Sequence, residues 1–301
     1  MGVITTGNWP KLLWPGLHAI FGQSYDELPL QWTDLFNKET SKQAFEEELQ
    51  GTGFPLAKIK PQGAAIEYVS DAQGYLVRYT PVVFASGFIV SWEEEQDNLY
   101  ETVAKRRTKN LAFIMRQTKE NVCAGGYNLA FDGTNQPGGD AVAWISASHP
   151  SLAGNQSNIG TADLSETAIE DMIVQIMNAT DNQGMHIGLT GMSLHVAPAN
   201  WYESNRILKS VLQNDSSLNA INVLKATNAL QKGIKVNNYF TDADAWFIRT
   251  NCPDGLKLFE RNALAFAEDN DFDTKNHKYA AVERYSVGQS DWHSLYGSAG
   301  A

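Results

Sequence analysis

The acidic residues best suited to bind a metal ion lie in two short stretches. The run 269–273 begins like a calcium-binding loop, but Thr274 stands where such a loop needs glycine and Ala280 where it needs a bidentate glutamate. We therefore expect a solvated loop there. Asp242 and Asp244 form a D-x-D pair of the kind that binds divalent ions in transferases, although such pairs are common by chance. The apolar residues around this pair predict a turn that leads into a buried strand.

The histidines and cysteines lack the spacing of a catalytic or metal site. His186 and His195 have no cysteine or third histidine at zinc-binding spacing, so we interpret both as structural residues. Cys123 is expected to be a small buried apolar side chain rather than a nucleophile. The nucleophile elbow, the phosphate-binding loop, the dinucleotide fingerprint and the zinc-protease motif are all missing from the sequence. We therefore predict that the protein is not an enzyme and uses no cofactor or metal.

Length and composition are those of a folded protein. The chain has 301 residues, of which 43% are hydrophobic and 19% charged, enough for a substantial core. Its formal net charge of −11 argues against a surface that wraps nucleic acid by neutralising phosphates. The most apolar run, 81–92, is too short to span a bilayer, and two cysteines fit a reducing cytoplasm. We expect neither specific nucleic-acid recognition nor membrane insertion.

One long amphipathic helix is predicted from Ser91 to Val122. Ser91 and Glu94 have the spacing of a capping box, in which each side chain satisfies a backbone N–H at the start of a helix. Apolar residues then recur every three or four positions, and Gly125-Gly126 is expected to end the helix. At 1.5 Å per residue this helix would be roughly 45 Å long. We interpret it as a strut.

A basic cluster, Lys105-Arg106-Arg107, lies in the middle of this predicted helix. It is small and has no interleaved aromatic residues, so a nucleic-acid patch is a poor explanation. We expect these cations to pair with acidic residues of the same chain or of an adjacent copy. Arg106 and Arg107 are therefore candidate contacts between subunits.

The first 50 residues predict an arm that lies across another surface. Trp9-Pro10 and Trp14-Pro15 interrupt any long helix, yet the segment is too rich in large apolar residues for a solvated tail. Such a segment covers either a neighbouring subunit or its own domain, and both alternatives stay open at this point. Trp9, Trp14 and Phe21 are the candidate contacts with a neighbour.

Residues 65–79 predict a β-hairpin. Two runs of alternating apolar and polar residues flank turn residues at 71–74. Because an isolated hairpin is marginal in water, it must lie on another surface. The acidic stretch 41–50 before it is predicted to form a short helix, and 82–90 after it a strand. The candidate contact residues of the hairpin are Tyr68, Tyr75, Arg78 and Tyr79.

The second half of the chain alternates helices and short strands. A stretch rich in Gly, Ser and Asn at 151–162 predicts an exposed linker, and a helix is expected to begin near Asp163 or Ser165. Helices and strands then alternate to about residue 245, with a strand near Val223, which predicts an α/β module. The final segments are predicted to be antiparallel strands at 245–250, 256–260 and 279–285.

The order of these segments resembles the major capsid protein of tailed double-stranded DNA bacteriophages, the Hong Kong ninety-seven-type fold. An aromatic arm, a projecting hairpin, a long helix, an α/β module and a return to a sheet follow one another as in that family. Short phrases of the sequence also resemble it: residues 144–150 with 157–158, 164–184, 194–210, 239–247 and 284–298.

The resemblance implies an α+β fold with five parts. These are an N-terminal arm (1–53), an extended β-hairpin loop (54–90), a peripheral domain with the spine helix (91–162), an axial domain (163–248) and a return to the peripheral domain (249–301). The arm and the extended loop would reach across neighbouring subunits.

The resemblance also implies a structural role. The chain would be the major capsid subunit, which self-assembles through hexamers and pentamers into an icosahedral shell around a packaged double-stranded DNA genome. Its partners would be a scaffolding protein, a portal and decoration proteins, with assembly in the host cytoplasm and a final place in the virion. Two alternatives stay open: an encapsulin-like bacterial shell protein, and a metal- or nucleotide-dependent α/β enzyme with acidic residues or histidines converging in one concave site.

Overall fold

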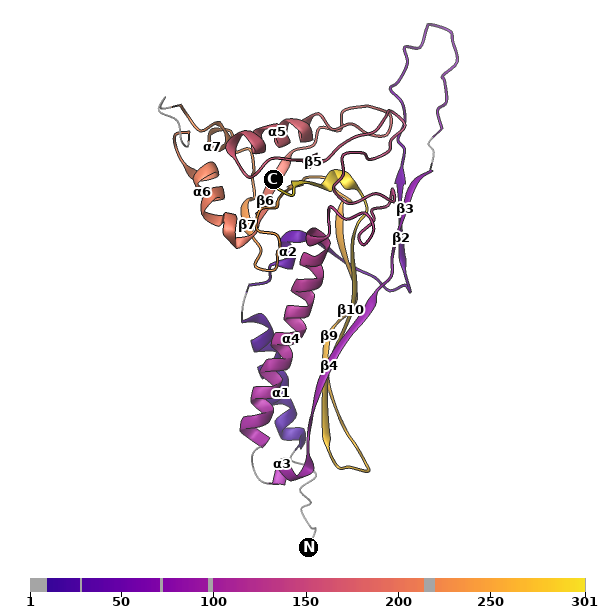
Figure 1. The fold of residues 1–301 in the computed structure, drawn as a ribbon. Helices are drawn as coiled ribbons and strands as arrows, with labels where there is room; N and C mark the ends of the chain where they lie inside the picture. Colours follow the sequence, from indigo (N-terminus) through magenta and orange to yellow (C-terminus); the bar gives the residue numbers. More distant parts are fainter. Residues whose placement is uncertain (1–9, 28, 71–72, 97–99, 214–219, 301) are drawn as a thin grey trace.

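The computed structural model describes residues 10–27, 29–70, 73–96, 100–213 and 220–300, with the backbone alone for 10–16, 95–96 and 100–102. Within these residues the strands form a four-stranded sheet, a five-stranded sheet and a two-stranded ribbon. Figure 1 shows an elongated molecule in which the long helix α4 (Tyr100–Asn128) runs beside the long strands. The five-stranded sheet lies at one end of this helix, and the ribbon projects to the side.

The predicted capping box forms, but it begins a short helix, α3 (Trp92–Gln96). The Glu94 N–H donates to Ser91 Oγ at 3.2 Å, and the Ser91 N–H donates to Glu94 Oε2 at 3.4 Å. The long helix is α4, whose 29 residues span about 44 Å. The prediction that Gly125-Gly126 ends it was wrong. At Gly126 a Cβ atom would lie 2.8 Å from the Trp144 ring, so this glycine allows close packing rather than a helix end.

A helix, α1 (Pro10–Asp26), replaces the predicted arm along part of the N-terminal segment. It runs in the same direction as α4 (Figure 1) and packs Leu17 and Phe21 into a cluster with Leu111 and Met115. Pro15 was expected to interrupt a helix here, because proline removes one helical hydrogen bond. The helix nevertheless continues through this position, since burial of its apolar face against α4 stabilises it. For residues 17–26, the alternative of a layer on the chain's own domain is confirmed.

The four-stranded sheet has the order β1-β9-β10-β4. The strand β1 (Asn37–Thr40) is parallel to β9 (Leu256–Asn270), which pairs with β10 (His277–Gln289) in a long antiparallel hairpin. The strand β4 (Val82–Val90), predicted from its apolar run, pairs with β10. The predicted strands at 256–260 and 279–285 exist, but both extend further, and 269–273 belongs to the tip of the hairpin.

The ribbon pairs β2 (Glu46–Gly51) with β3 (Gln73–Tyr79), antiparallel. The prediction of a hairpin between 65–69 and 75–79 was therefore wrong about the partner strand, and the prediction of a helix at 41–50 was wrong as well. Successive residues of β2 are alternately half-buried and exposed, as expected for a strand that packs on one side. A long loop, of which residues 52–70 are described, joins the two strands.

The five-stranded sheet has the order β5-β11-β8-β6-β7. The α5 helix (Glu166–Met177) packs against it, and of the two predicted starts, near Asp163 or Ser165, the structure has Ser165 as the N-cap. The segment near Val223 is a short helix rather than a strand, because Asn222 caps it by accepting the Lys225 N–H. The remaining elements are β5 (Ile159–Gly160), β6 (Gly191–Val196), α6 (Trp201–Lys209), α7 (Val223–Ala226), β7 (Gly233–Val236), β8 (Trp246–Thr250) and β11 (Leu295–Ser298).

Three clusters of buried apolar residues hold these layers together. One lies under α1 and α4, a second lies between α5 and the five-stranded sheet, and a third joins the end of α4 to both sheets. In the joining cluster Tyr127 of α4 stacks on Phe240 and meets Phe247 of β8 edge-on. The α2 helix (Trp32–Leu35) also packs into it. The long helix is thus built into the body at one end.

Candidate assembly surfaces

The loop 52–70 extends beyond the ribbon, away from the rest of the molecule (Figure 1). Its large apolar side chains are 46% to 97% exposed: Phe54, Leu56, Ile59, Ile66, Tyr68 and Val69. Lys58 Nζ and Glu67 Oε1 pair across the loop at 2.7 Å. A contiguous exposed apolar surface of this kind is typical of a protein interaction site.

The ribbon itself carries two of the predicted contact residues at its surface. Arg78 of β3 is exposed and pairs with Glu47 of β2, and its guanidinium lies 4.4 Å from the centre of the Phe45 ring. Tyr75 is half-buried, and its hydroxyl donates to the carbonyl oxygen of Pro150 at 2.6 Å. Tyr68, in the loop, is 91% exposed. These three side chains lie on the projecting part of the subunit.

Tyr79 and Phe21 lie in the chain's own core instead. Tyr79 is 3% exposed, hydrogen-bonds to Ser290 at 2.5 Å and meets the Phe259 ring edge-on. Phe21 is 5% exposed and stacks on Phe266 with ring centres 4.8 Å apart. Neither side chain presents a face to a neighbouring subunit, which corrects the interpretation of these two residues as surface contacts. Trp9 and the side chain of Trp14 lie outside the described residues.

The basic cluster on α4 is divided between internal and external roles. Arg107 makes two hydrogen bonds of 2.9 Å to the Glu94 carboxylate and another to the carbonyl oxygen of Ile89. It thereby ties α4 to α3 and β4, and Glu94 has a lowered pKa because Arg107 hydrogen-bonds to it. Arg106 is exposed on the outer side of the helix. Of this cluster, Arg106 is the cation best placed to meet another molecule.

A second exposed apolar surface lies on the four-stranded sheet. The side of β4 and β10 that faces away from the cluster under α1 and α4 exposes Val83 and Ile89 at 54% each and Val282 at 38%. Around them the sheet carries small residues, with Ala85 opposite Val282. Sequence reasoning did not identify this surface as a site. The signal was present, because the run 82–90 is apolar at nearly every position rather than at alternate ones.

Buried charges join the opposite face of this sheet to α4. Lys119 of α4 lies 3.3 Å from both Glu260 of β9 and Glu283 of β10. Burial raises the pKa of Glu283, whereas Lys38 and Lys119 hold the pKa of the less buried Glu260 below its usual range despite a contrary effect of burial. Sequence reasoning missed this cluster, since Lys119 is more than 140 residues from either glutamate in the chain.

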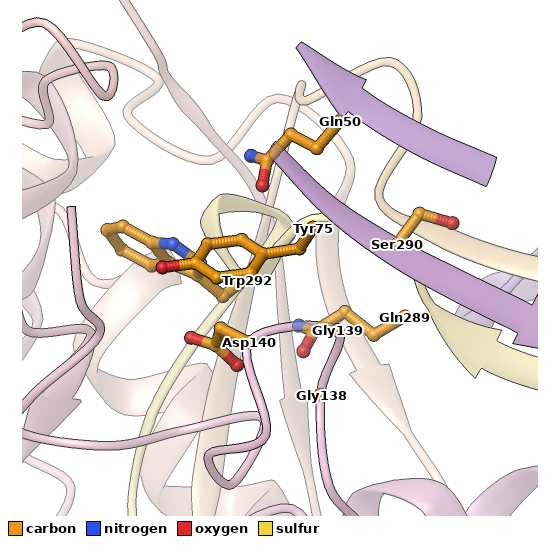
Figure 2. Close-up of a pocket in the computed structure, with 8 residues that line it drawn as sticks. All are labelled: Gln50, Tyr75, Gly138, Gly139, Asp140, Gln289, Ser290 and Trp292. Carbon is orange, nitrogen blue, oxygen red and sulfur yellow. The ribbon is translucent and has the colours of Figure 1, made fainter. Parts of the chain in front are cut away.

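Two pockets lie where the ribbon meets the body. Figure 2 shows the smaller, of about 10 Å³, between Tyr75 of β3, Gly139 and Asp140 of one loop, and Ser290 and Trp292 of another. The larger, of about 500 Å³, lies between the edge of β2 and residues such as Cys252 and His293. Burial raises the pKa of the Cys252 thiol, so this thiol is a poor nucleophile.

The histidines, cysteines and aspartates considered above as catalytic or metal-binding residues do not gather in one site. Burial, more than the charge of Arg249, lowers the pKa of His195 to about 3, so its ring stays neutral in the core beside Ser193. Cys123 is fully buried and burial raises its pKa as well. His186 and Asp242 are exposed. Among the residues that the structure describes, no three side chains of His, Cys, Asp or Glu gather as metal ligands.

Within the same part of the chain, none of the helices combines the length and apolar character needed to cross a membrane.

The fold is similar to several solved capsid structures. The virus-like particle from Pyrococcus furiosus aligns with a TM-score of 0.52 at 10% identity, covering 94% of this chain and 97% of that one. The capsid of an empty GTA particle gives 0.55 at 9% identity, covering 89% and 88%. The mature capsid of bacteriophage PhiM1 gives 0.54 at 13% identity, covering 87% and 84%. At these identities the likeness establishes the fold. No curated protein matches the sequence.

The sequence itself matches a family model. The model described as "Phage capsid protein" covers residues 75–297, well over half of the chain, including β3, β4, α4 and nearly all of both large sheets. This match supports a structural role and does not favour an encapsulin-like shell protein or an α/β enzyme. The chain therefore belongs to the phage capsid protein family, and it is a major capsid subunit located in the virion capsid, not an enzyme.

Proposed function

We propose that many copies of this chain form an icosahedral shell, through hexamers and pentamers, around a packaged double-stranded DNA genome. The observation that carries this proposal is the loop 52–70, whose large apolar side chains are left exposed by the described residues of the subunit. Symmetric assembly provides such cover from an identical copy. The net charge of −11 suits a wall that does not adhere to the enclosed DNA.

The proposed contacts between copies use the projecting parts of the subunit. Tyr68 and the other exposed residues of the loop would meet an apolar surface on a neighbour, and the uncovered face of β4 and β10 has matching character. Arg78 and Arg106 would pair with acids of the neighbouring copy, as would be expected in a chain with excess negative charge. Trp9 and Trp14, in the N-terminal segment, are proposed to contribute as well.

The five predicted parts are also proposed to work as assembly units. The five-stranded sheet with α5–α7 would form the axial part at the centre of each capsomer, and α4 with the long strands the peripheral part. The boundary at residue 249 needs one adjustment, because β11 (Leu295–Ser298) pairs with β8 and β5 in the five-stranded sheet. A scaffolding protein, a portal and decoration proteins are the proposed partners, and the host cytoplasm the proposed place of assembly.

Electron microscopy of the purified protein tests the proposal. We expect hollow particles or ring-like capsomers. A variant in which a short Gly-Ser linker replaces residues 54–70 should keep the thermal stability of the subunit and lose assembly. A wild-type protein that stays monomeric at all concentrations, with scaffold present, would contradict the proposal. Global unfolding of the linker variant would show instead that the loop belongs to the core of the subunit.

A further inference from the structure

Two histidines lie against Trp292, at the place where the ribbon joins the body. The imidazole of His149 stacks on the indole with ring centres 4.5 Å apart and planes 4° apart, and the imidazole of His293 stacks on it at 3.6 Å and 26°. Each histidine also pairs with an aspartate at 2.6 Å: His149 with Asp140, and His293 with Asp291. All of these rings are buried.

The hydrogen bonds around His149 require a proton at each ring nitrogen. The Asn158 amide nitrogen lies within 3.3 Å of three carbonyl oxygens, and its oxygen accepts the Ser146 N–H at 2.7 Å, so the orientation of this amide is fixed. His149 Nε2 lies 3.0 Å from that oxygen and must donate to it. Nδ1 faces a carboxylate oxygen of Asp140 at 2.6 Å, and this contact also needs a proton between the two atoms.

His293 is held in the same way. Its Nε2 lies 3.0 Å from the carbonyl oxygen of Thr180, which only accepts hydrogen bonds. Its Nδ1 lies 2.6 Å from Asp291 Oδ1, which also accepts the backbone N–H of His293 at 2.9 Å. Burial raises the pKa of Asp291, but the hydrogen bonds and charge of His293 outweigh it and hold this pKa below the usual range. Both ring nitrogens of His293 thus face acceptors, so the Asp291–His293 pair holds two protons, one more than a neutral imidazole supplies.

Both pairs adjoin the attachment points of the ribbon. Asp140 follows Gly139, whose backbone packs on Val77 of β3, and Pro150 follows His149 and accepts the hydroxyl of Tyr75. Asp291 follows Ser290, which hydrogen-bonds to Glu48 of β2 and to Tyr79 of β3. Figure 2 shows Tyr75, Asp140, Ser290 and Trp292 converging on the same small pocket.

We propose that the two aspartate–histidine pairs on Trp292 form a proton-dependent clamp that fixes the β2–β3 ribbon to the body of the subunit. When either imidazole loses a proton, one of its nitrogens points a lone pair at an oxygen, and the contact changes from attraction to repulsion. His149 then loses a contact with Asp140 or Asn158, and His293 a contact with Asp291 or Thr180, so the two segments that the ribbon rests on, 138–150 and 289–294, are held less firmly.

The other ionisable groups around the clamp do not replace this role. Tyr75 faces Asp140, and burial followed by the Asp140 charge raises its pKa. Burial also raises the pKa of Tyr79 and of Cys252, whose thiol hydrogen-bonds to Asp291, so both remain neutral. Glu48, Asp254 and Lys257 line the larger pocket, and Lys257 forms ion pairs with both Glu48 and Asp254. Histidine is the side chain that changes charge between about pH 5 and pH 8.

The direction of the pH effect follows from the protons held. The clamp is complete when a proton lies in each of the four contacts of the two imidazoles, so a rise in pH, which favours proton release, can only weaken it. Each proton that opening of the ribbon releases makes the opening equilibrium about tenfold more favourable per pH unit. The effect should be confined to the ribbon and the two segments below it.

Hydrogen exchange of the full-length protein between about pH 6 and pH 8 tests the clamp. After correction for intrinsic exchange, amides of β2 and β3 should lose protection by up to about tenfold per pH unit for each proton released, while amides of α5 should not change. His149→Gln should give weak ribbon protection at every pH, and His186→Gln, at an exposed histidine, should keep the wild-type profile. A wild-type ribbon whose protection is independent of pH would overturn the proposal.

Ring-nitrogen chemical shifts of histidine-labelled wild-type protein provide a test that needs no folded variant. The chain contains six histidines. In the pH range where the ribbon is protected, the resonances of His149 and His293 should show both nitrogens protonated, whereas His195, beside Ser193, should show a neutral ring. A neutral ring at either His149 or His293 in that range would overturn the proposal, whatever the exchange profile shows.

Discussion

Lys119 of α4 lies 3.3 Å from Glu283 of β10, and the side chains of both residues are shielded from solvent. The ammonium group also lies 4.9 Å from the centres of the Trp32 and Tyr285 rings. The charge of Lys119 therefore acts on two carboxylates, those of Glu260 and Glu283, in the layer between the helix and the four-stranded sheet, and Lys38 also pairs with Glu260. Long-range charge pairing fixes the rotation of α4 against this sheet.

Removal of this cation should be strongly destabilising. Lys119→Met would leave the buried Glu283 without a counter-charge and Glu260 with Lys38 alone, and we expect the free energy of unfolding to fall by about 3–5 kcal/mol. Lys109→Met, at an exposed position of the same helix, should change it by less than about 0.5 kcal/mol. Urea unfolding measures both values. The double variant Lys119→Met/Glu283→Gln should recover part of the loss, and equal stability of the two single variants would refute this account.

Glu120, the next residue along α4, gives the stability a defined pH dependence. Burial raises its pKa from the ordinary 4.5, although the Gln31 and Trp32 backbone N–H groups hydrogen-bond to it. A raised pKa in the folded state means that the folded chain binds the proton more tightly than the unfolded chain. The contribution of this group is thus present at acidic pH and is lost as the pH rises above about 4.5 towards the folded-state pKa.

Glu120→Gln should remove this loss. The amide oxygen still accepts the Gln31 N–H, which lies 2.8 Å from the carboxylate in the wild type, and the side chain no longer ionises. We expect the stability difference between variant and wild type to shift in favour of the variant between about pH 4 and pH 7. Urea titrations at both pH values measure it. Glu93→Gln, at an exposed site on α3, serves as the control and should show no such shift.

Local patterns in the sequence predicted where several helices and one strand begin. The capping box at Ser91 and the N-cap at Ser165 depend on side chains that bond within three residues, so spacing alone reveals them. The strand β4 was recognised from its apolar run. The predictions of an aromatic arm and of a hairpin at 65–79 rested on large apolar residues that require a partner surface, and this signal does not say which surface covers them.

Long-range pairing explains what the sequence did not predict. The strand partner of β3 is β2, more than twenty residues earlier in the chain, and no local pattern distinguishes it from the nearer run at 65–69. The helix α1 forms despite Pro15 because α4 covers its apolar side. His149 and His293, more than 140 residues apart in the chain, meet only through Trp292.

Two tyrosines of the predicted contact set should respond oppositely to substitution. Tyr79→Ala empties a buried position against Phe259 and should lower the free energy of unfolding by about 3–5 kcal/mol. Tyr68→Ala, at a side chain that is 91% exposed, should change it by less than about 0.5 kcal/mol while reducing the yield of assembled particles. Thermal melts and particle counts by electron microscopy measure the two effects. An assembly-competent Tyr68→Ala would remove this residue from the proposed interface.

Adjacent glycines near the end of α4 provide the sharpest test of how the helix packs. At Gly126 a Cβ atom would lie 2.8 Å from Trp144 Cη2 and 2.9 Å from Cζ3, whereas at Gly125 no atom lies within 4 Å. Gly126→Ala forces the Trp144 ring to shift in a filled core and should cost about 1–3 kcal/mol. Gly125→Ala should stabilise the protein by about 0.5–1 kcal/mol, since alanine has the higher helix propensity. Urea unfolding of both variants compares the same substitution one residue apart. If the two changes had the same sign, α4 would have to end before these glycines, as the sequence alone had suggested.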